Sequence, residues 1–165
     1  MIKIYTDGSC WNRQFKNKQG GVGGWCAIIT ENDSQLDYIS GNFLPAKNNQ
    51  TEIFAVYKAL EYSIQKGYEE IDIVADSDYA IDCISIWSPN WEKRNWYSTR
   101  HKREILYKDL IKQTYELSKQ LNVTWTRIKG HSGIYFNHRA DELANEERKR
   151  GTRLLIEGGI THGFI

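Results

Sequence analysis

The sequence predicts an α/β fold in which helices flank a mixed five-stranded sheet. Three β-type segments come first along the chain, and the later segments alternate between helical and strand patterns. Strands joined by short turns pair antiparallel, whereas strands separated by helices pair in parallel. A chain of 165 residues is also near the usual size of one domain. We therefore expect three antiparallel strands followed by two parallel strands in a single domain.

The first half of the chain predicts the three antiparallel strands. Apolar or β-branched residues alternate with other residues over 2–6, and this strand is expected to end at Asp7. A polar loop follows over about 12–19. Two further strands are predicted over 22–30 and 36–43, separated by a turn of polar composition. Short connections of this kind favour an antiparallel meander.

The second half alternates between helices and strands. Apolar residues recur at helical spacing from Ile53 to Ile64, and Gly67 is a natural helix stop. Ser77 is a good N-cap, and the helix that begins there is expected to end before Pro89. The predicted elements are a helix over 53–66, a strand over 70–75, helices over 78–88 and 105–121, a strand over 123–128 and a helix over 137–150.

Composition and charge exclude several classes of protein. The apolar fraction of 40 % and the charged fraction of 26 % are typical of a globular chain, and no stretch reaches the ~18 apolar residues of a membrane span. Cys10, Cys26 and Cys83 form no CxxC pair, which argues against a disulfide framework and favours an intracellular protein. The net charge is only +1. Residues 91–103 nevertheless carry a local net charge of +4, so this segment could attract a polyanion.

Four acidic residues lie where ligand sites form in α/β folds. Asp7 and Asp76 follow predicted strands, Glu52 lies in the first turn of a predicted helix, and Asp141 lies in the last predicted helix. If the four carboxylates converge, each raises the pKa of the others. A hard divalent cation removes this penalty and prefers carboxylate oxygens. Two such ions a few Å apart would stabilise both reacting oxygens of a phosphoryl transfer.

Each acid also has an ordinary structural explanation. Asp7 begins an Asp-Gly-Ser turn sequence, and Glu52 follows Asn49 at a spacing close to that of a capping box. Asp76 could simply end a strand, and Asp141 could be a solvated helix residue. Taken singly, these explanations are the better ones, and only the combination with further motifs favours function.

Six blocks of the sequence, in order, are similar to those of one known family. They are YTDGSC at 5–10, NNQTE at 48–52, DSDY at 76–79, WSPNWEKRNW at 87–96, KGHSG at 129–133 and NHRADELA at 137–144. In these blocks the chain resembles type 1 ribonuclease H over about residues 1–147. The resemblance implies an RNase H-like fold, with residues 1–150 as one catalytic domain, a basic protrusion at about 87–103, and 151–165 as an unassigned tail.

The resemblance also implies a reaction. The family cleaves the RNA strand of an RNA·DNA hybrid endonucleolytically with two Mg²⁺ ions, for which Mn²⁺ could substitute, and leaves 3′-hydroxyl and 5′-phosphate ends. By position, Asp7, Glu52, Asp76 and Asp141 match the family's catalytic and metal-binding acids. His131 matches its catalytic histidine, on a loop between the last strand and the last helix, with a role in proton transfer or product departure.

A wider set of residues is expected to contact the hybrid. Asn amides can donate to and accept from a 2′-hydroxyl, and basic side chains can bind phosphates. The tryptophans are expected chiefly to pack the protrusion, because a duplex does not splay its bases. The expected substrate-binding residues are Cys10, Asn12, Asn48, Asn49, Asp78, Trp87, Lys93, Arg94, Trp96, Arg100, Lys102, Arg103 and Asn137.

Two features depart from the family pattern. The loop over 11–19 is longer than usual, and Asp78 stands where an uncharged residue is common. Cysteine usage and the lack of a long apolar stretch further predict a cytoplasmic protein without a membrane segment, and we expect a monomer without an obligate protein partner. The alternatives are a catalytically weak module that binds hybrid or double-stranded RNA, another nuclease of the same fold and, more remotely, a small-molecule enzyme.

Overall fold

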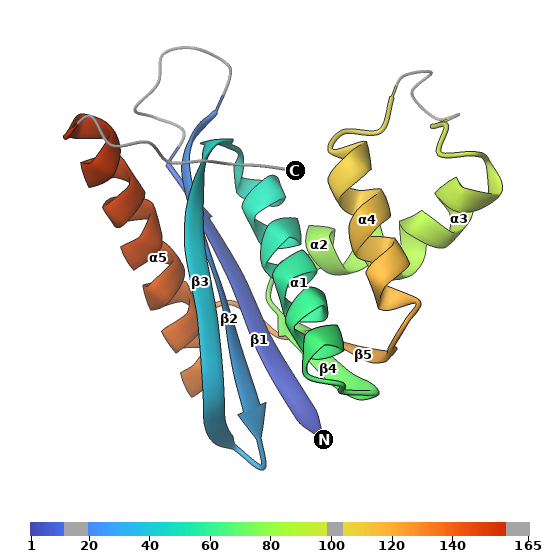
Figure 1. Cartoon of the computed structure of the whole chain (residues 1–165), viewed down its shortest axis with the longest axis horizontal. Coiled ribbons are helices and arrows are strands. Elements are labelled where there is room, and N and C mark those ends of the chain that lie inside the picture. The colour runs from blue at the N-terminus through green and yellow to red at the C-terminus, as the bar shows by residue number, and fades with distance from the viewer. Residues whose placement is uncertain (12–19, 99–103, 158–165) are drawn as a thin grey trace.

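A mixed five-stranded sheet forms the centre of the computed structural model, which describes residues 1–11, 20–98 and 104–157 (Figure 1). Its strand order is β3-β2-β1-β4-β5. The predictions that fall outside the described residues are those for the 12–19 loop and for Asn12, Arg100, Lys102 and Arg103.

The strand directions agree with the sequence pattern. The strands β1 (Ile2–Cys10), β2 (Gly21–Glu31) and β3 (Ser34–Ala46) form an antiparallel meander. The shorter strands β4 (Glu70–Ala75) and β5 (Asn122–Arg127) add in parallel, with β4 beside β1. The predicted mixed sheet is therefore confirmed, and β1 lies at its centre, where the two pairing modes meet.

Strand β1 continues beyond its predicted end. Asp7 pairs with Cys26, and the antiparallel ladder reaches Cys10 opposite Gly23. Pairing with β2 therefore overrides the turn propensity of the Asp-Gly-Ser sequence, as tertiary context commonly does in strands. As a result, the Asp7 backbone is held by the sheet rather than by a loop.

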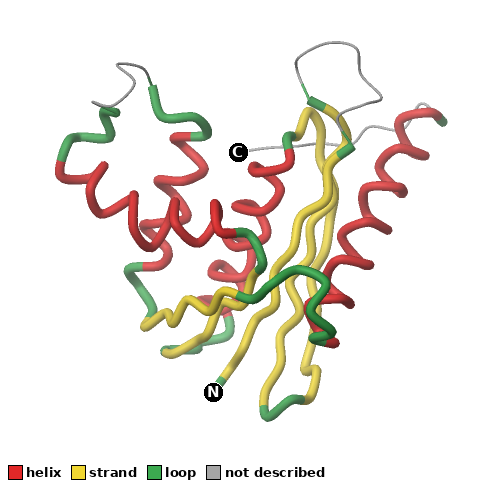
Figure 2. Tube along the Cα trace, turned by 180° about the vertical axis from the view of Figure 1, so that it is seen from behind, coloured by secondary structure: helices red, strands yellow, loops and turns green. Residues whose placement is uncertain are grey.

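Helices cover both faces of the sheet. Helix α5 (Tyr135–Ile156) lies against one face, while α1 (Asn48–Gln65) and α4 (Lys108–Ser118) lie on the other side (Figure 1). The view from behind shows the same layers, with α5 separated from the other helices by the strands (Figure 2). Residues of α1 such as Ile53 and Leu60 are fully buried in the larger hydrophobic cluster. Burial of apolar side chains of this kind makes the largest favourable contribution to the free energy of folding.

Helix α5 approaches the sheet closely because its facing residues are small. Ala140 and Ala144 pack against Tyr5 of β1 and Ile28 of β2. A Cβ atom on Gly24 of β2 would lie only 2.1 Å from the Ala144 carbonyl oxygen. Glycine at this position therefore permits the helix to lie on the strand, and this contact fixes the position of the helix that carries Asp141.

The predicted helix end before Pro89 is wrong. Helix α2 (Asp78–Asp82) continues through a π-helical turn, η2 (Cys83–Trp87), into α3 (Ser88–Lys93). Pro89 lies in the first turn of α3, where a helix has no internal partner for the N–H that proline lacks. The chain therefore passes the proline without leaving the helical conformation.

Two other helices differ from their predicted bounds. Helix α4 is shorter than the predicted 105–121, because Tyr107 adopts a left-handed φ of 57° just before it begins. Helix α5 is longer than the predicted 137–150 and extends to Ile156, into the segment that had no assignment. Amphipathic periodicity locates such helices but leaves their ends uncertain by a few residues.

The sequence argues against a disulfide framework and against a membrane span, and the described residues bear on both. Cys26 and Cys83 are buried free thiols. Among the helices of the described ranges, none combines the length and the apolar character needed to cross a bilayer.

Candidate active site

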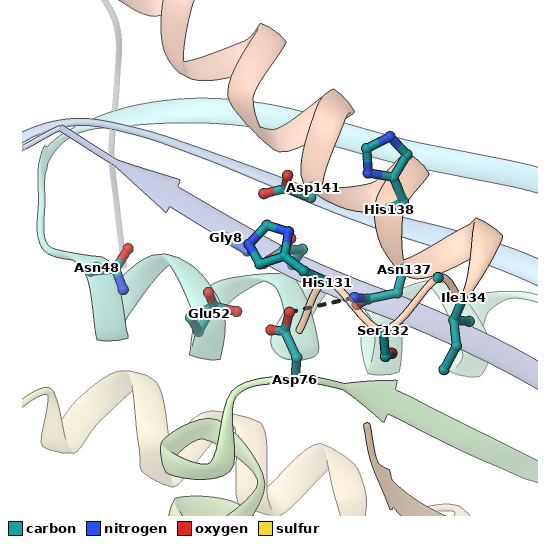
Figure 3. Close-up of a pocket in the computed structure, with 12 residues that line it drawn as sticks. Gly8, Asn48, Glu52, Asp76, His131, Ser132, Ile134, Asn137, His138 and Asp141 are labelled. Carbon is teal, nitrogen blue, oxygen red and sulfur yellow. Dashed lines mark hydrogen bonds between the residues drawn. The ribbon is translucent and has the colours of Figure 1, made fainter. Parts of the chain in front are cut away.

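A pocket of about 450 Å³ lies where β1, α1, the end of β4 and the start of α5 meet (Figure 3). It is lined by all four acids that the sequence singled out and by the predicted histidine. These residues are Asp7, Glu52, Asp76, Asp141 and His131, and the pocket also contains Asn48, Asn137, Ser132 and His138.

Three of the acids form a tight group. One carboxylate oxygen from each of Asp7, Glu52 and Asp76 lies within 4.8 Å of the other two. Asp7 and Glu52 are buried, with exposed fractions of 4 % and 8 %. Asp141 lines the same pocket from α5 but stands outside this group. Three different elements of the fold therefore bring the group together, and a fourth supplies the remaining acid.

The electrostatics of Asp7 reflect this crowding. Burial, followed by repulsion from Asp76 and Asp141, raises its pKa from 3.8 to about 7. A hydrogen bond from the Gly8 N–H to Asp7 Oδ1, with a length of 2.8 Å, acts in the opposite direction. An Asp carboxyl in this setting binds a proton at pH values at which a solvated one would be ionised.

Glu52 responds in the same way. Burial, and then repulsion from Asp7 and Asp76, raises its pKa well above the ordinary value. A bound divalent cation would reverse both shifts, because it favours the ionised carboxylates. The donor set consists of hard carboxylate oxygens, which suits Mg²⁺ or Mn²⁺ rather than a thiophilic metal. The residues present therefore fit a divalent cation site.

Asn137 joins α5 to the end of β4. Its Nδ2 donates to Asp76 Oδ2 at 3.4 Å, and the residue is 4 % exposed. Its Oδ1 is buried without a hydrogen-bond partner among the described residues. A buried polar atom of this kind is costly unless a ligand or water satisfies it, so Asn137 carries an unsatisfied acceptor next to the residues of the site.

His131 lies on the loop between β5 and α5. It is exposed and adopts a left-handed φ of 56°, and it is followed closely by Gly133 with φ of 82°. Figure 3 shows its imidazole between Asp141 and Asp76 in this view. The backbone of the preceding Gly130 is close to the acids, because a Cβ there would lie 3.1 Å from Asp76 Oδ2.

The predicted contacts at the start of α1 lie at the rim of the site. Asn48 lines the pocket, and Asn49 is exposed beside it. The suggested capping pair of Asn49 and Glu52 is not formed. Instead, the Lys47 N–H donates to Gln50 Oε1 at 3.3 Å, which leaves Glu52 free to face the acids.

Cys10 and Asp78 lie outside the pocket. Cys10 Sγ, at the end of β1, donates to the Ala46 carbonyl oxygen at 3.1 Å, and burial raises the pKa of its thiol. Asp78 is exposed at the start of α2, and its Oδ1 lies 3.6 Å from Arg127 Nη1 on β5. The structure thus directs the extra acid toward a basic residue rather than toward the other carboxylates.

The described part of the protrusion divides into buried and exposed side chains. Trp96 is only 6 % exposed and packs against Trp91 and Tyr115, with ring centroids 6.3 and 6.0 Å apart. Trp87 is 37 % exposed, and Lys93 and Arg94 are exposed. The aromatic side chains therefore build the segment, while its basic side chains face solvent.

Asp141 has a hydrogen-bond partner that no sequence motif singled out. Asn145 Nδ2 donates to Asp141 Oδ1 at 3.2 Å. The spacing of four residues on a predicted helix was a usable signal for this pair. Asn145 Oδ1 also accepts from Ser9 Oγ, 136 positions away, and Ser9 Oγ accepts from Arg148 Nε, 139 positions away. No local pattern indicates such contacts.

Comparison with known proteins agrees with the site. The family model described as RNase H matches residues 1–149. A ribonuclease H of Francisella philomiragia is 39 % identical over 145 residues, which cover 88 % of this chain and 89 % of that protein. The fold, the acidic site and these matches define a hydrolase of the nuclease class. More particularly, the chain belongs to the RNase H family and is a ribonuclease H enzyme.

Solved structures show the same fold at lower sequence identity. LC9-RNase H1, a type 1 RNase H with the type 2 active-site motif, aligns with a TM-score of 0.74 and 21 % identity, over 90 % of this chain and 72 % of that one. LC11-RNase H1, solved in complex with an RNA/DNA hybrid, aligns with a TM-score of 0.66 and 22 % identity, over 92 % of this chain and 99 % of that one.

Proposed function

We propose that this enzyme hydrolyses the RNA strand of RNA·DNA hybrids endonucleolytically and leaves 3′-hydroxyl and 5′-phosphate ends. The observation that carries the proposal is the group formed by the buried carboxylates of Asp7 and Glu52 and the half-buried carboxylate of Asp76, with one oxygen of each within 4.8 Å of the other two. The hybrid bound by the similar LC11-RNase H1 supports the choice of substrate.

Asp7, Glu52, Asp76 and Asp141 would hold two divalent cations, Mg²⁺ or its substitute Mn²⁺. When bound, such ions supply charge stabilisation for both the attacking and the leaving oxygen of phosphodiester hydrolysis. The protein's own contribution is to hold the carboxylates in place: the β1–β2 ladder fixes Asp7, and Asn137 holds Asp76. The site is then organised before substrate arrives, which lowers the cost of the reaction.

His131 would carry a proton to or from the reacting oxygens, or assist product departure. It is exposed and lines the pocket, and histidine is the side chain that most often transfers protons in general acid–base catalysis. Its left-handed backbone conformation belongs to a turn whose glycine neighbours allow it to change position.

The rim residues would read the hybrid by shape. Asn48 and Asn49 can exchange hydrogen bonds with the 2′-hydroxyls of the RNA strand. Cys10 lies near them, since it donates to Ala46 just ahead of α1. The predicted hybrid contacts of Trp87, Trp96 and Asp78 belong to the same proposal. The basic protrusion would contact phosphates, and its affinity should therefore fall with salt. We further propose a cytoplasmic monomer, with which the buried free thiols of Cys26 and Cys83 are compatible.

A cleavage assay on three duplexes tests the proposal. RNA·DNA hybrid, double-stranded RNA and double-stranded DNA of one sequence are incubated with the full chain in Mg²⁺, with and without a chelator. We expect cleavage of the RNA strand of the hybrid only, and its loss on chelation or in Asp7→Asn. Salt-dependent binding of the hybrid without cleavage in Mg²⁺ or Mn²⁺ would instead indicate a binding module.

A further inference from the structure

The fourth acid is attached to the site differently from the other three. Asp7 lies within the central strand, Glu52 lies on α1, and Asp76 directly follows β4, which pairs with β1. Asp141 comes from α5, on the opposite face of the sheet from α1 (Figure 1). Its position relative to the group of three therefore depends on contacts between α5 and β1.

A chain of hydrogen bonds provides such a contact. Arg148 Nε donates to Ser9 Oγ at 2.9 Å, Ser9 Oγ donates to Asn145 Oδ1 at 2.6 Å, and Asn145 Nδ2 donates to Asp141 Oδ1 at 3.2 Å. Ser9 follows Asp7 by two residues on β1, so the two side chains are on the same face of the strand. The chain thus connects the strand that carries Asp7 to the carboxylate of Asp141.

The direction of these hydrogen bonds is fixed at both ends. An arginine can only donate, and an ionised carboxylate can only accept. Arg148 therefore makes Ser9 donate onward, and the Asn145 amide then presents its NH₂ group to Asp141. Arg148 itself lies over the Trp11 ring, with 5.1 Å between its Cζ atom and the ring centroid, which further restricts its orientation.

We propose that Asn145 is a positioning residue for Asp141, held in register by Ser9 and Arg148, and that it sets the affinity of the acidic site for divalent cations. The inference rests on the proposed function, because it concerns the same cation site. Outer partners that orient metal-binding carboxylates typically change metal affinity by 10–100-fold when removed. Asn145 fits this role, since it touches the acid but does not line the pocket.

The experiment compares Asn145→Ala with Asn42→Ala. Asn42 Nδ2 on β3 donates to Glu147 Oε2 on α5 at 2.8 Å, so each substitution removes a hydrogen bond from an amide to a carboxylate of α5. Only Asn145 contacts one of the four acids. Mg²⁺ binding to the full chain is measured by titration calorimetry, and hybrid cleavage is measured as a function of Mg²⁺ concentration. Stability in chelator is measured by urea denaturation.

We expect Asn145→Ala to weaken Mg²⁺ binding about 10-fold or more, while saturating Mg²⁺ restores most of the cleavage rate. Asn42→Ala should bind Mg²⁺ as the wild type does. Ser9→Ala should also weaken Mg²⁺ binding, although it changes no residue of α5. The Ser9→Ala/Asn145→Ala double variant should bind Mg²⁺ no more weakly than Asn145→Ala, because Ser9 acts through Asn145.

The inference would be overturned if Asn145→Ala bound Mg²⁺ as tightly as Asn42→Ala does. It would also be overturned if the losses of Mg²⁺ affinity in Ser9→Ala and Asn145→Ala added up in the double variant. If Asn145→Ala does not fold, Ser9→Ala is sufficient as the test: a Mg²⁺ affinity equal to that of the wild type would overturn the inference. A wild-type chain that neither binds Mg²⁺ nor cleaves hybrid would instead remove the proposed function, and the inference with it.

Discussion

Gly8 lies so close to Glu52 that a Cβ on the glycine would be 2.6 Å from the Glu52 backbone nitrogen. The same Cβ would lie 2.5 Å from Thr51 Oγ1. No other amino acid fits there without moving α1 away from β1. The glycine after Asp7 therefore sets the distance between two of the acids, and it does more than favour a turn.

Gly8→Ala should consequently separate Asp7 from Glu52. Overpacking of this kind typically costs about 1–3 kcal/mol of stability, and we expect hybrid cleavage to fall by more than the loss of folded protein explains. The measurement is the free energy of unfolding in urea together with kcat. Gly67→Ala is the control, because its Cβ would meet nothing within 4 Å while its left-handed φ of 74° strains the alanine far from the acids. It should lose some stability, about 1 kcal/mol, but retain cleavage. Equal cleavage by both variants would contradict this account of Gly8.

The crowded carboxyls should make the metal-free protein less stable as the pH rises. The pKa of Asp7 is raised from 3.8 to about 7, and that of Glu52 is also raised. At these two acids the folded state thus binds protons more tightly than the unfolded chain, so their contribution to stability is fully present below about pH 4 and is lost as the pH rises toward 7.

Asp7→Asn isolates this contribution. Because each pKa unit corresponds to about 1.4 kcal/mol, the variant should be more stable than the wild type at pH 8 in chelator by more than about 1 kcal/mol. The difference should shrink at pH 4, where the wild-type acids are protonated. Urea denaturation at the two pH values measures both quantities. A variant that is less stable than the wild type at pH 8 would show that the carboxyls are not in conflict.

Mg²⁺ should stabilise the wild type and leave Asp7→Asn nearly unchanged. A ligand that binds only the folded state at 100 times its Kd adds about 2.7 kcal/mol. We therefore expect the Tm of the wild type to rise with Mg²⁺ concentration at pH 8. The same rise in Asp7→Asn would place the cation elsewhere on the protein.

His131→Ala should reduce the rate of cleavage rather than the affinity for metal or hybrid. General acid–base groups typically contribute about 10²–10⁴-fold to a rate. The matched control is His138→Ala, since His138 lines the same pocket but pairs with Glu142, with 3.2 Å between His138 Nε2 and Glu142 Oε1. We expect a reduced kcat at unchanged KM for His131→Ala and a near-normal kcat for His138→Ala. The opposite order of effects would transfer the catalytic role to His138.

Substitutions in the protrusion should affect either hybrid affinity or the stability of the fold, depending on whether the side chain is exposed or buried. Lys93→Gln and Arg94→Gln should each lower the salt dependence of hybrid binding, by about one in log–log slope per lost phosphate contact. Trp96→Ala should instead destabilise the fold by about 3–5 kcal/mol, because a buried aromatic is removed. Binding isotherms at several salt concentrations and urea denaturation distinguish the two. An unchanged salt slope in both basic variants would mean that these side chains do not contact the hybrid.

Local pattern is sufficient to predict the sheet, whereas the four acids are singled out only by the resemblance of six ordered motifs to type 1 ribonuclease H. Asp7 and Asp76 follow apolar strand segments, and the carboxyl ends of adjacent parallel strands meet at one edge of a sheet. Their convergence with Glu52 and Asp141 was predicted from ordered motifs, since no spacing along the chain brings four distant residues together.

The rest depended on contacts that the sequence does not encode locally. Pro89 was expected to end a helix, but it occupies a first turn, where its missing N–H costs little. The link from Ser9 to Asn145 exists only because Gly24 lets α5 lie against β2. The sequence around Gly8 favours a turn, whereas in the structure this glycine allows α1 to approach β1 closely.

The location of bound cations tests the central claim most directly. Crystals of the wild-type chain soaked in Mn²⁺ can be measured by anomalous diffraction, which identifies each ion by its position. The account predicts anomalous peaks among the carboxylate oxygens of Asp7, Glu52, Asp76 and Asp141. Carboxylates that point apart at saturating Mn²⁺, with no peak between them, would contradict it.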